Sequence, residues 1–219
     1  MQAPPSGPER LVRAAVASGV RDRRVLDALR RVLREEFVPP DRVTEAYLDR
    51  PVPIPHGQVT TQPSLVAQMV AALELQGKER VLEVGTGLGF QTAMLAVLAR
   101  EVWSIERFPD LASAAEENLR RAGIENADVV VGDGTLGVPE RAPFDAVVVS
   151  AASPEVPEPL VQQVAEGGRL VHPLGPGGQE AVTAFVKESG RLVPSAAVVP
   201  AHFVRLIGRH GLEERSTPS

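Results

Sequence analysis

The sequence contains no cysteine, and this absence excludes three kinds of chemistry. A chain of 219 residues without cysteine has no disulfide bond, no thiol nucleophile and no cysteine-ligated metal. Its four histidines, His56, His172, His202 and His210, lack the close spacing that is typical of a metal site. We therefore expect no metal centre. His56 lies in a distinctive loop, and we favour a structural role for it over the alternative of a functional one.

The sequence also lacks a strong positive charge and a long apolar run. Its formal net charge is −5 at pH 7 and its pI is about 5.5, which counts against RNA or DNA as a partner. No apolar stretch approaches the length of a membrane span, and the N-terminus lacks a signal-peptide pattern. We therefore expect a cytoplasmic protein, a monomer, that works without a membrane.

Three glycines at alternate positions form the most informative motif. Residues 81–90 read Val-Leu-Glu-Val-Gly-Thr-Gly-Leu-Gly-Phe, an apolar run that ends in Gly85, Gly87 and Gly89. The pattern predicts a strand, a tight turn and a helix start, where glycines let a ligand approach the backbone and free N–H groups face it. The spacing departs from the dinucleotide motif Gly-x-Gly-x-x-Gly and is commoner in enzymes that bind S-adenosylmethionine. The alternative is a generic glycine-rich turn.

Acidic residues follow the next two apolar runs. Glu106 closes the run Trp-Ser-Ile-Glu, and Asp133 stands between two glycines after the run 129–131. In a parallel sheet, ligands bind outside the carboxyl ends of the strands, and an acid at the second end accepts hydrogen bonds from ribose hydroxyls. Together with the glycines, these residues predict an adenosine pocket. The alternatives are a solvated carboxylate at Glu106 and an ordinary turn residue at Asp133.

Strands alternate with helices from residue 80 onwards. The alternation predicts an α/β fold with a doubly wound, mostly parallel, Rossmann-like sheet. The C-terminal strand patterns have no helix between them, so we expect an antiparallel end to the sheet. The expected strands are 80–84, 101–105, 128–131, 144–149, 168–172, 181–186, 191–193 and 203–207, and the expected helices are 90–99, 109–122 and 157–165.

The N-terminal part reads as a helical and loop subdomain. Apolar residues at helical spacing over 9–36 predict two helices separated by Gly19, with the arginines on the solvated face. The stretch 37–62 predicts an ordered, packed loop, and Pro63 predicts the first turn of a further helix. The expected organisation is a disordered tail (1–8), one domain (9–208, with the subdomain at 9–75 and the core at 80–208) and a second tail (209–219).

Several further segments carry more specific patterns. They are Arg-Glu-Glu-Phe-Val-Pro (34–39), Ala-Tyr-Leu-Asp (46–49), Pro-Ile-Pro-His-Gly-Gln (53–58), Thr-Thr-Gln-Pro (60–63), Leu-Glu-Val-Gly-Thr-Gly-Leu-Gly-Phe-Gln-Thr-Ala (82–93), Gly-Asp-Gly (132–134), Ala-Pro-Phe-Asp-Ala (142–146), Ser-Ala-Ala-Ser-Pro (150–154), Gly-Gly-Arg-Leu-Val-His-Pro-Leu-Gly (167–175) and Gln179. Together they resemble the protein-L-isoaspartate O-methyltransferases, a family of class I methyltransferases. The resemblance covers roughly residues 12–207.

The resemblance implies methyl transfer from S-adenosyl-L-methionine to the α-carboxylate of L-isoaspartyl residues in damaged proteins and peptides, which starts their repair to aspartate. A carboxylate is already ionised at neutral pH and a sulfonium methyl group is already activated. Alignment of oxygen, methyl and sulfur then supplies much of the catalysis, up to about 7–11 kcal/mol in well-oriented systems. Hydrogen bonds to the carboxylate and exclusion of water supply the rest.

The resemblance also implies which residues form the site. Thr61 matches a serine whose hydroxyl lies beside the reacting carboxylate, which makes it the expected catalytic residue; a helix cap is its alternative role, and both can coexist. The glycine motif would hold the methionine side of the cofactor, Glu106 the ribose, and Asp133 with Gly134 the adenine edge. The full expected sets are Gly85, Thr86, Gly87, Gly89, Glu106, Asp133, Gly134 and Gln179 for the cofactor, and Thr60, Thr61, His202, Phe203 and Val204 for the substrate.

Two departures from the family pattern leave alternatives open. Thr61 adds a methyl group to the usual serine, which stiffens χ1 and crowds the carboxylate. Arg205 replaces a proline and adds a positive charge near the proposed peptide groove, either at its rim or as a selector of acidic substrates. The alternatives are a methyltransferase for aspartate in one dedicated peptide and a non-catalytic relative that binds S-adenosylhomocysteine. An RNA base methyltransferase is disfavoured, because Ser-Ala-Ala-Ser-Pro stands where Asn/Asp-Pro-Pro is expected.

Overall fold

A seven-stranded β-sheet organises the structure, a computed structural model that describes residues 7–175 and 180–213. Neighbouring strands are parallel from β5 to β7 and antiparallel from β7 to β9, so the expected mostly parallel sheet with an antiparallel end is confirmed. The spatial order is β5 (Ala127–Val131), β4 (Glu101–Glu106), β3 (Arg80–Val84), β6 (Phe144–Val149), β7 (Val164–Leu174), β8 (Glu180–Glu188) and β9 (Arg191–Ala201).

The order in which strands are added to the sheet reverses at β3. From β3 the chain adds β4 and β5 on one side, and then returns to place β6 on the other. The Gly85 N–H donates to Ile105 O (2.9 Å) and the Ser150 N–H to Val84 O (2.8 Å), so the carboxyl ends of β3, β4 and β6 meet. In open α/β sheets, ligands bind in the crevice at such a switch point. The fold therefore brings the glycine motif to the expected ligand position.

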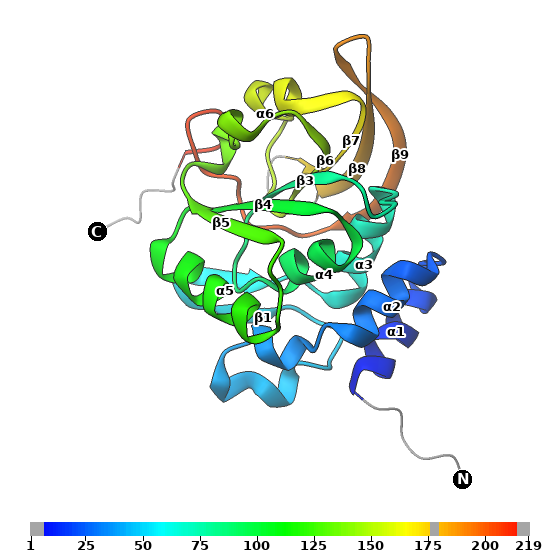
Figure 1. Cartoon of the computed structure of the whole chain (residues 1–219), viewed down its shortest axis with the longest axis vertical. Helices are drawn as coiled ribbons and strands as arrows, with labels where there is room; N and C mark the ends of the chain where they lie inside the picture. The colour runs from blue at the N-terminus through cyan, green and yellow to red at the C-terminus, as the bar shows by residue number, and fades with distance from the viewer. Residues whose placement is uncertain (1–6, 176–179, 214–219) are drawn as a thin grey trace.

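Hydrophobic clusters pack on both faces of the sheet. Side chains alternate along a strand, and on β3 Val81 joins one cluster whereas Leu82 and Val84 join the other. Figure 1 shows the sheet between α6 on one face and α3, α4 and α5 on the other. The helices are α1 (Gly7–Ala17), α2 (Arg23–Arg31), α3 (Pro63–Ala72), α4 (Phe90–Leu98), α5 (Pro109–Arg121) and α6 (Glu158–Gln163).

Two expectations for the C-terminal strands are wrong. β9 runs eleven residues to Ala201, well past the expected end at 193. Its two prolines, Pro194 and Pro200, suggested interruptions, but β9 is an edge strand, where proline costs little. Residues 203–207 form no strand, because they pair only through two isolated bridges, Ala152 with Arg205 and Ile207 with Leu212. β7 and β8 also extend beyond their expected bounds.

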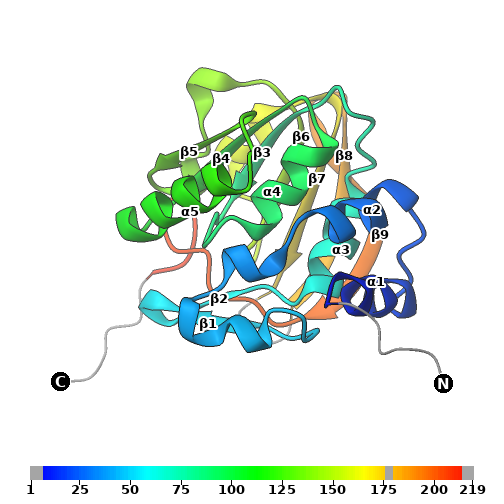
Figure 2. The same ribbon diagram turned by 60° about the horizontal axis from the view of Figure 1, so that its bottom comes forward.

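The first two helices of the N-terminal subdomain, α1 and α2, pack beside α3 and α4, as Figure 2 shows. Gly19 separates α1 from α2, as expected, although α1 already begins at Gly7. The expected packed loop contains an additional two-stranded sheet, which lies apart from the large sheet. The two strands of this small sheet are β1 (Val52–Ile54) and β2 (Gln58–Thr60), and the 3₁₀ helices around it are η1 (Arg34–Phe37), η2 (Pro40–Glu45) and η3 (Pro55–Gly57).

Arg34 corrects the expectation that the arginines of this region are solvated. Its side chain is 0% exposed, and its guanidinium lies 5.7 Å from the centre of the Phe90 ring. Burial lowers its pKa to about 10, against the opposing charge of Asp49. The guanidinium donates five hydrogen bonds, to the carbonyls of Ala46 (2.9 Å), Leu48 (3.1 Å), Arg50 (3.1 Å) and Thr61 (3.3 Å) and to the Thr60 hydroxyl (2.8 Å).

The Arg34 cluster generates a prediction about stability. Replacing Arg34 with methionine keeps the apolar stem and leaves five acceptors without their donor. We expect Arg34→Met to lower the free energy of unfolding by about 3 kcal/mol or more, and Tm by roughly 6–12 °C. Thermal and urea unfolding measure this change. Arg31→Met, which removes an exposed arginine of α2, is the matched control. An equal effect of the two substitutions would contradict the role given to Arg34.

Candidate active site

The glycine loop links β3 to α4 and forms the floor of the site. Gly85 has a φ of +95°, which strains any residue with a side chain. At Gly134, which follows β5, an added Cβ would lie 2.5 Å from Val84 Cγ1. Gly89 is the N-cap of α4, so the free N–H groups of the first turn lie beside the loop. The backbone of the loop is therefore accessible to a ligand. The free N–H groups of the helix start favour a ligand that carries a negative charge or hydrogen-bond acceptors.

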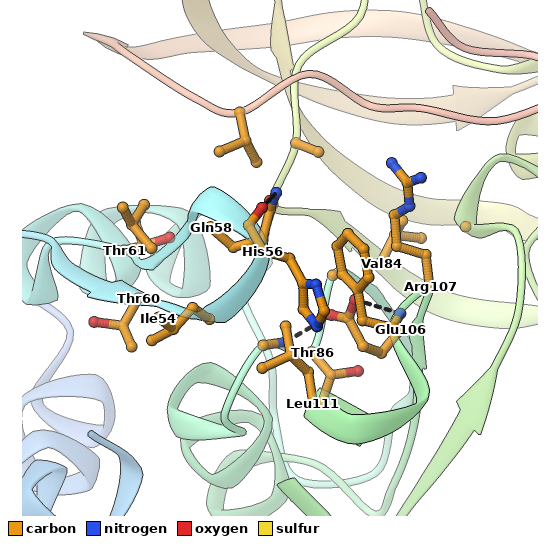
Figure 3. A pocket seen from close by; sticks show the side chains of 18 of the residues that line it. Ile54, His56, Gln58, Thr60, Thr61, Val84, Thr86, Glu106, Arg107 and Leu111 are labelled. Carbon is orange, nitrogen blue, oxygen red and sulfur yellow. Dashed lines mark hydrogen bonds between the residues drawn. The ribbon is translucent and has the colours of Figure 1, made fainter. Parts of the chain in front are cut away.

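A cavity of about 560 Å³ lies above this loop, and we call it the glycine-loop cavity. This volume is within the range of small-molecule sites. Figure 3 shows that Thr61, at the end of β2, and Glu106, at the end of β4, stand on opposite sides of His56. The residues that carry polar groups or backbone to the cavity include Gly85, Thr86, Gly87, Glu106, Gly134 and Ser150.

Glu106 is held in a fixed position at the cavity wall. Its side chain is buried, and its carboxylate accepts hydrogen bonds from the N–H groups of Gly87 (2.9 Å) and Phe108 (3.1 Å). A carboxylate oxygen accepts more than one hydrogen bond, so both oxygens retain capacity for a ligand hydroxyl. The geometry suits the predicted ribose contact.

Asp133 has a different environment from Glu106. Gly134 lines the glycine-loop cavity, but Asp133 does not. One Asp133 oxygen accepts from Thr135 N (2.9 Å) and Oγ1 (2.6 Å), and the other accepts from Arg209 N (2.7 Å). Burial raises its pKa, but these hydrogen bonds outweigh it and the net pKa is lowered. Asp133 thus holds the backbone at Arg209, the residue at which the sequence led us to expect the start of the C-terminal tail. The adenine-edge role stays a prediction.

A second carboxyl group is buried directly beneath the glycine loop. Glu83 is 0% exposed and accepts hydrogen bonds from the side chains of Gln91 (3.0 Å), Thr92 (2.5 Å) and Ser104 (2.7 Å). None of these three donors carries a charge. Burial raises the pKa of Glu83 to about 7, against the lowering effect of the three hydrogen bonds. The protonated form of Glu83 therefore persists in the native state up to about pH 7.

The donors around Glu83 extend to the wall of the cavity. Ser104 Oγ lies 2.5 Å from Thr86 Oγ1, and Gln91 Nε2 donates to Ser150 Oγ at 2.9 Å. Thr86 and Ser150 both line the glycine-loop cavity. Glu83 thus supports the ligand-facing residues from below.

His56 joins the small β1–β2 sheet to the core at the cavity wall. Its ring stacks on Phe108, with ring centres 4.1 Å apart and 4° between the planes. Its Nε2 lies 2.8 Å from Asp110 Oδ2, and the hydrogen bond from His56 lowers the pKa of Asp110. Its φ of +60° is unusual for a residue with a side chain. The structural role expected for His56 stays a prediction, and the ring also lines the cavity.

Thr61 stands where two cavities meet. A second cavity of about 530 Å³, which we call the His202 cavity, is lined by Ala201, His202 and Phe203 among others. Four residues line both cavities, namely Val59, Thr61, Ser150 and Val204. The predicted catalytic hydroxyl and the predicted peptide edge therefore share one junction with the predicted cofactor site.

The Thr61 hydroxyl is not used as a helix cap. Gln62 is the N-cap of α3, Pro63 is the first helical residue as expected, and the Ser64 N–H is taken by Asp49 Oδ1 at 2.9 Å. The Thr61 hydroxyl makes no hydrogen bond to any residue that the structure describes. Thr60 differs, because it is buried and its hydroxyl accepts from Arg34. Only one of the two threonines presents a hydroxyl that a ligand can use.

The residues around the cavity differ in part from those that the sequence led us to expect. Gln179, expected near the cofactor, lies outside the described residues. Ser150 and Phe108 were missed, although the strand-end argument that selected Glu106 applies equally to Ser150 after β6. Within residues 7–175 and 180–213, no group of three or more histidine, aspartate or glutamate side chains is placed to hold a metal ion.

Comparisons with known proteins agree with this geometry. A doubly wound sheet with a glycine loop after its first strand and an acid after the next is the arrangement of a class I, S-adenosylmethionine-dependent methyltransferase. The family model described as Protein-L-isoaspartate(D-aspartate) O-methyltransferase (PCMT) matches residues 7–211, and the chain belongs to this family. The enzyme class and family expected from the sequence are confirmed.

Individual relatives cover most of the chain. A protein-L-isoaspartate O-methyltransferase of Methanoculleus marisnigri is 50% identical over 204 residues, which are 92% of this chain and 91% of the relative. One from Myxococcus xanthus is 53% identical over 160 residues, 73% of this chain and 76% of the relative. A solved protein-L-isoaspartate O-methyltransferase is 30% identical, with a TM-score of 0.83 over 93% of this chain and 67% of that one.

The pKa of Glu83 generates a prediction about pH. An acid whose pKa rises from 4.5 when unfolded to about 7 when folded stabilises the fold fully below pH 4.5 and loses this contribution as pH rises through 7. We expect Glu83→Gln, which stays neutral, to gain roughly 3 kcal/mol of unfolding free energy relative to the wild type over this range. Urea unfolding at several pH values measures the difference. The exposed Glu116→Gln is the control. Parallel pH curves for wild type and Glu83→Gln would refute the raised pKa.

Proposed function

We propose that this chain methylates the α-carboxylate of L-isoaspartyl residues in damaged proteins and peptides. The observation that carries the proposal is the position of Thr61, which has an unused hydroxyl at the junction of the glycine-loop cavity and the His202 cavity. A methyl donor on one side and a peptide carboxylate on the other would meet at this junction. Family membership supports the choice of an isoaspartyl carboxylate as acceptor.

S-adenosyl-L-methionine supplies an activated methyl group when it is bound. The residues fit this cofactor, because the glycine loop leaves its backbone open and Glu106 presents a carboxylate that suits ribose hydroxyls. Thr61 would donate a hydrogen bond that orients one carboxylate oxygen, so that the other faces the methyl group. The site needs no strong base, because the acceptor is already ionised. Apolar residues at the wall, such as Ile54, Val66 and Leu206, exclude water.

The peptide would bind along residues 202–204, which follow β9 and pair with no strand that the structure describes. The Phe203 N–H already donates to Glu180 Oε2 (3.0 Å), and Val204 O accepts from Ala152 N (2.8 Å). Among residues 7–175 and 180–213, the other backbone groups of 202–204 have no hydrogen-bond partner, and we infer that they pair with an extended peptide, as in strand addition. Such main-chain pairing depends little on the peptide's side chains, which suits an enzyme that acts on many damaged proteins.

The proposal extends to the setting of the enzyme. No helix among the described residues has the length and apolar character to cross a membrane. The net charge of −5 disfavours nucleic acid as a partner. We propose a monomer that acts on proteins in the cytoplasm.

Methylation of paired peptides tests the proposed function. The two peptides carry L-isoaspartate or L-aspartate at one position and are otherwise identical, and the methyl group of S-adenosylmethionine is labelled. We expect base-labile label on the isoaspartyl peptide alone. Label on the aspartyl peptide would indicate a dedicated aspartate methyltransferase. Label on neither peptide, with cofactor still bound, would indicate a non-catalytic relative.

The hydroxyl of Thr61 is tested by two substitutions. Thr61→Val keeps the shape of the side chain and removes the hydroxyl, so we expect kcat/KM to fall roughly 10–100-fold. Thr61→Ser keeps the hydroxyl and should retain activity. Calorimetric binding of S-adenosylhomocysteine should be unchanged in both variants, because the hydroxyl serves the acceptor. Full activity of Thr61→Val would exclude the orienting role.

A further inference from the structure

Arg205 brings to the glycine-loop cavity a positive charge that no described residue pairs with. The residue lines this cavity, and its Nε is buried with no hydrogen-bond partner. Its guanidinium makes no hydrogen bond or ion pair with any residue in 7–175 or 180–213. The residue as a whole is partly exposed, and a charge held partly away from water is costly unless another group compensates it. An anion in the cavity would provide that compensation.

The other ionisable side chains at this cavity already have partners. The Glu106 carboxylate accepts from two backbone N–H groups, and His56 pairs with Asp110. The Arg107 guanidinium lies 4.8 Å from the centre of the Phe108 ring. Arg205 therefore differs from the other ionisable residues of the cavity. Its charge is available to bind a ligand and stabilises no contact among the described residues.

The backbone around Arg205 places it in the glycine-loop cavity, next to the junction with the His202 cavity. Val204 O accepts from Ala152 N (2.8 Å), and Leu206 N donates to Ala152 O (2.7 Å), which fixes Arg205 beside the end of β6. Val204, the preceding residue, lines both cavities at the Thr61 junction. Further along the same segment, Gly208 and Arg209 lie against Asp133, since a Cβ added at Gly208 would meet Asp133 Oδ1 and the Arg209 N–H donates to Asp133 Oδ2 at 2.7 Å. A carboxylate that enters through the junction would pass Val204 and come next to Arg205.

We propose that Arg205 binds the α-carboxylate of the isoaspartyl substrate. The inference rests on the proposed function and names a residue that selects the charged form of the acceptor. During transfer, a carboxylate oxygen forms a bond to the methyl carbon, the carbon–sulfur bond breaks with its electrons left on sulfur, and no proton moves. The anionic carboxylate becomes a neutral ester. The ion pair with Arg205 is therefore strongest before the reaction and is lost in the product.

This change of charge predicts how Arg205 affects the kinetics. An interaction that weakens as the reaction proceeds lowers KM without raising kcat. Arg205 would strengthen binding of the acceptor and favour release of the ester, which it no longer holds. A purely structural residue has no reason to separate KM from kcat in this way.

The experiment combines a variant with a modified ligand. The full chain, saturated with S-adenosylhomocysteine, is titrated with the isoaspartyl peptide and with the same peptide carrying an α-carboxamide. We expect the wild type to bind the carboxylate peptide about tenfold or more tightly than the carboxamide. Arg205→Met should bind both peptides alike, and Arg205→Lys should retain part of the preference. Arg191→Met, which removes an exposed arginine that lines neither cavity, should match the wild type.

Kinetic and cofactor measurements complete the test. Arg205→Met should raise the peptide KM about tenfold while kcat stays equal or rises. A preference for the carboxylate that persists in Arg205→Met overturns the inference, as does a wild type with no preference or no peptide binding. Loss of S-adenosylhomocysteine affinity with the peptide preference intact assigns Arg205 to the cofactor carboxylate and also overturns it. A wild type that binds selectively but does not methylate refutes the proposed function alone.

Discussion

The buried guanidinium of Arg34 is the interaction on which the acceptor side of the site depends. Its five hydrogen bonds hold together the chain from Ala46 to Thr61, a stretch that contains only two short strands and one short 3₁₀ helix. The same group lies over Phe90, the first residue of α4, which follows the glycine loop directly. One cation thus connects the threonine at the junction to the helix start beside the predicted cofactor. The two halves of the site keep their spacing because a single side chain contacts both.

A buried acid performs the corresponding task beneath the loop. Burial raises the pKa of Glu83, and the neutral donors that surround it offset this rise only in part. Such a group weakens the fold at neutral pH, and an apolar residue would avoid the cost. A hydrogen-bonding group at that position nevertheless fixes Gln91 and Ser104, and through them Ser150 and Thr86. The buried polar groups beneath the site thus fix the positions of the residues that line it and do not add to the stability of the fold.

The sequence predicted the central strands and the ligand edge well, because those features follow from local pattern. β3 and β6 have the expected bounds, and the glycine motif and Glu106 lie on one cavity. The failures have tertiary causes. The prolines of β9 are tolerated only because the strand lies at an edge, and Arg34 is buried only because distant carbonyls surround it. Nor does any local signal distinguish Thr60, whose hydroxyl is occupied, from Thr61, whose hydroxyl is not.

The contact of His56 with Phe108 and Asp110 has a consequence for exchange of the cofactor. On the Thr61 side, the wall of the glycine-loop cavity is fastened by a buried cation with five bonds, and opening it would disrupt the subdomain. On the His56 side, the wall is fastened by one stacked ring and one pair of partly exposed groups, which water replaces at little cost. The path of least resistance for a spent cofactor therefore runs past His56. The protein substrate and the cofactor would then enter and leave by separate routes. A large substrate protein would not have to dissociate before the spent cofactor is exchanged.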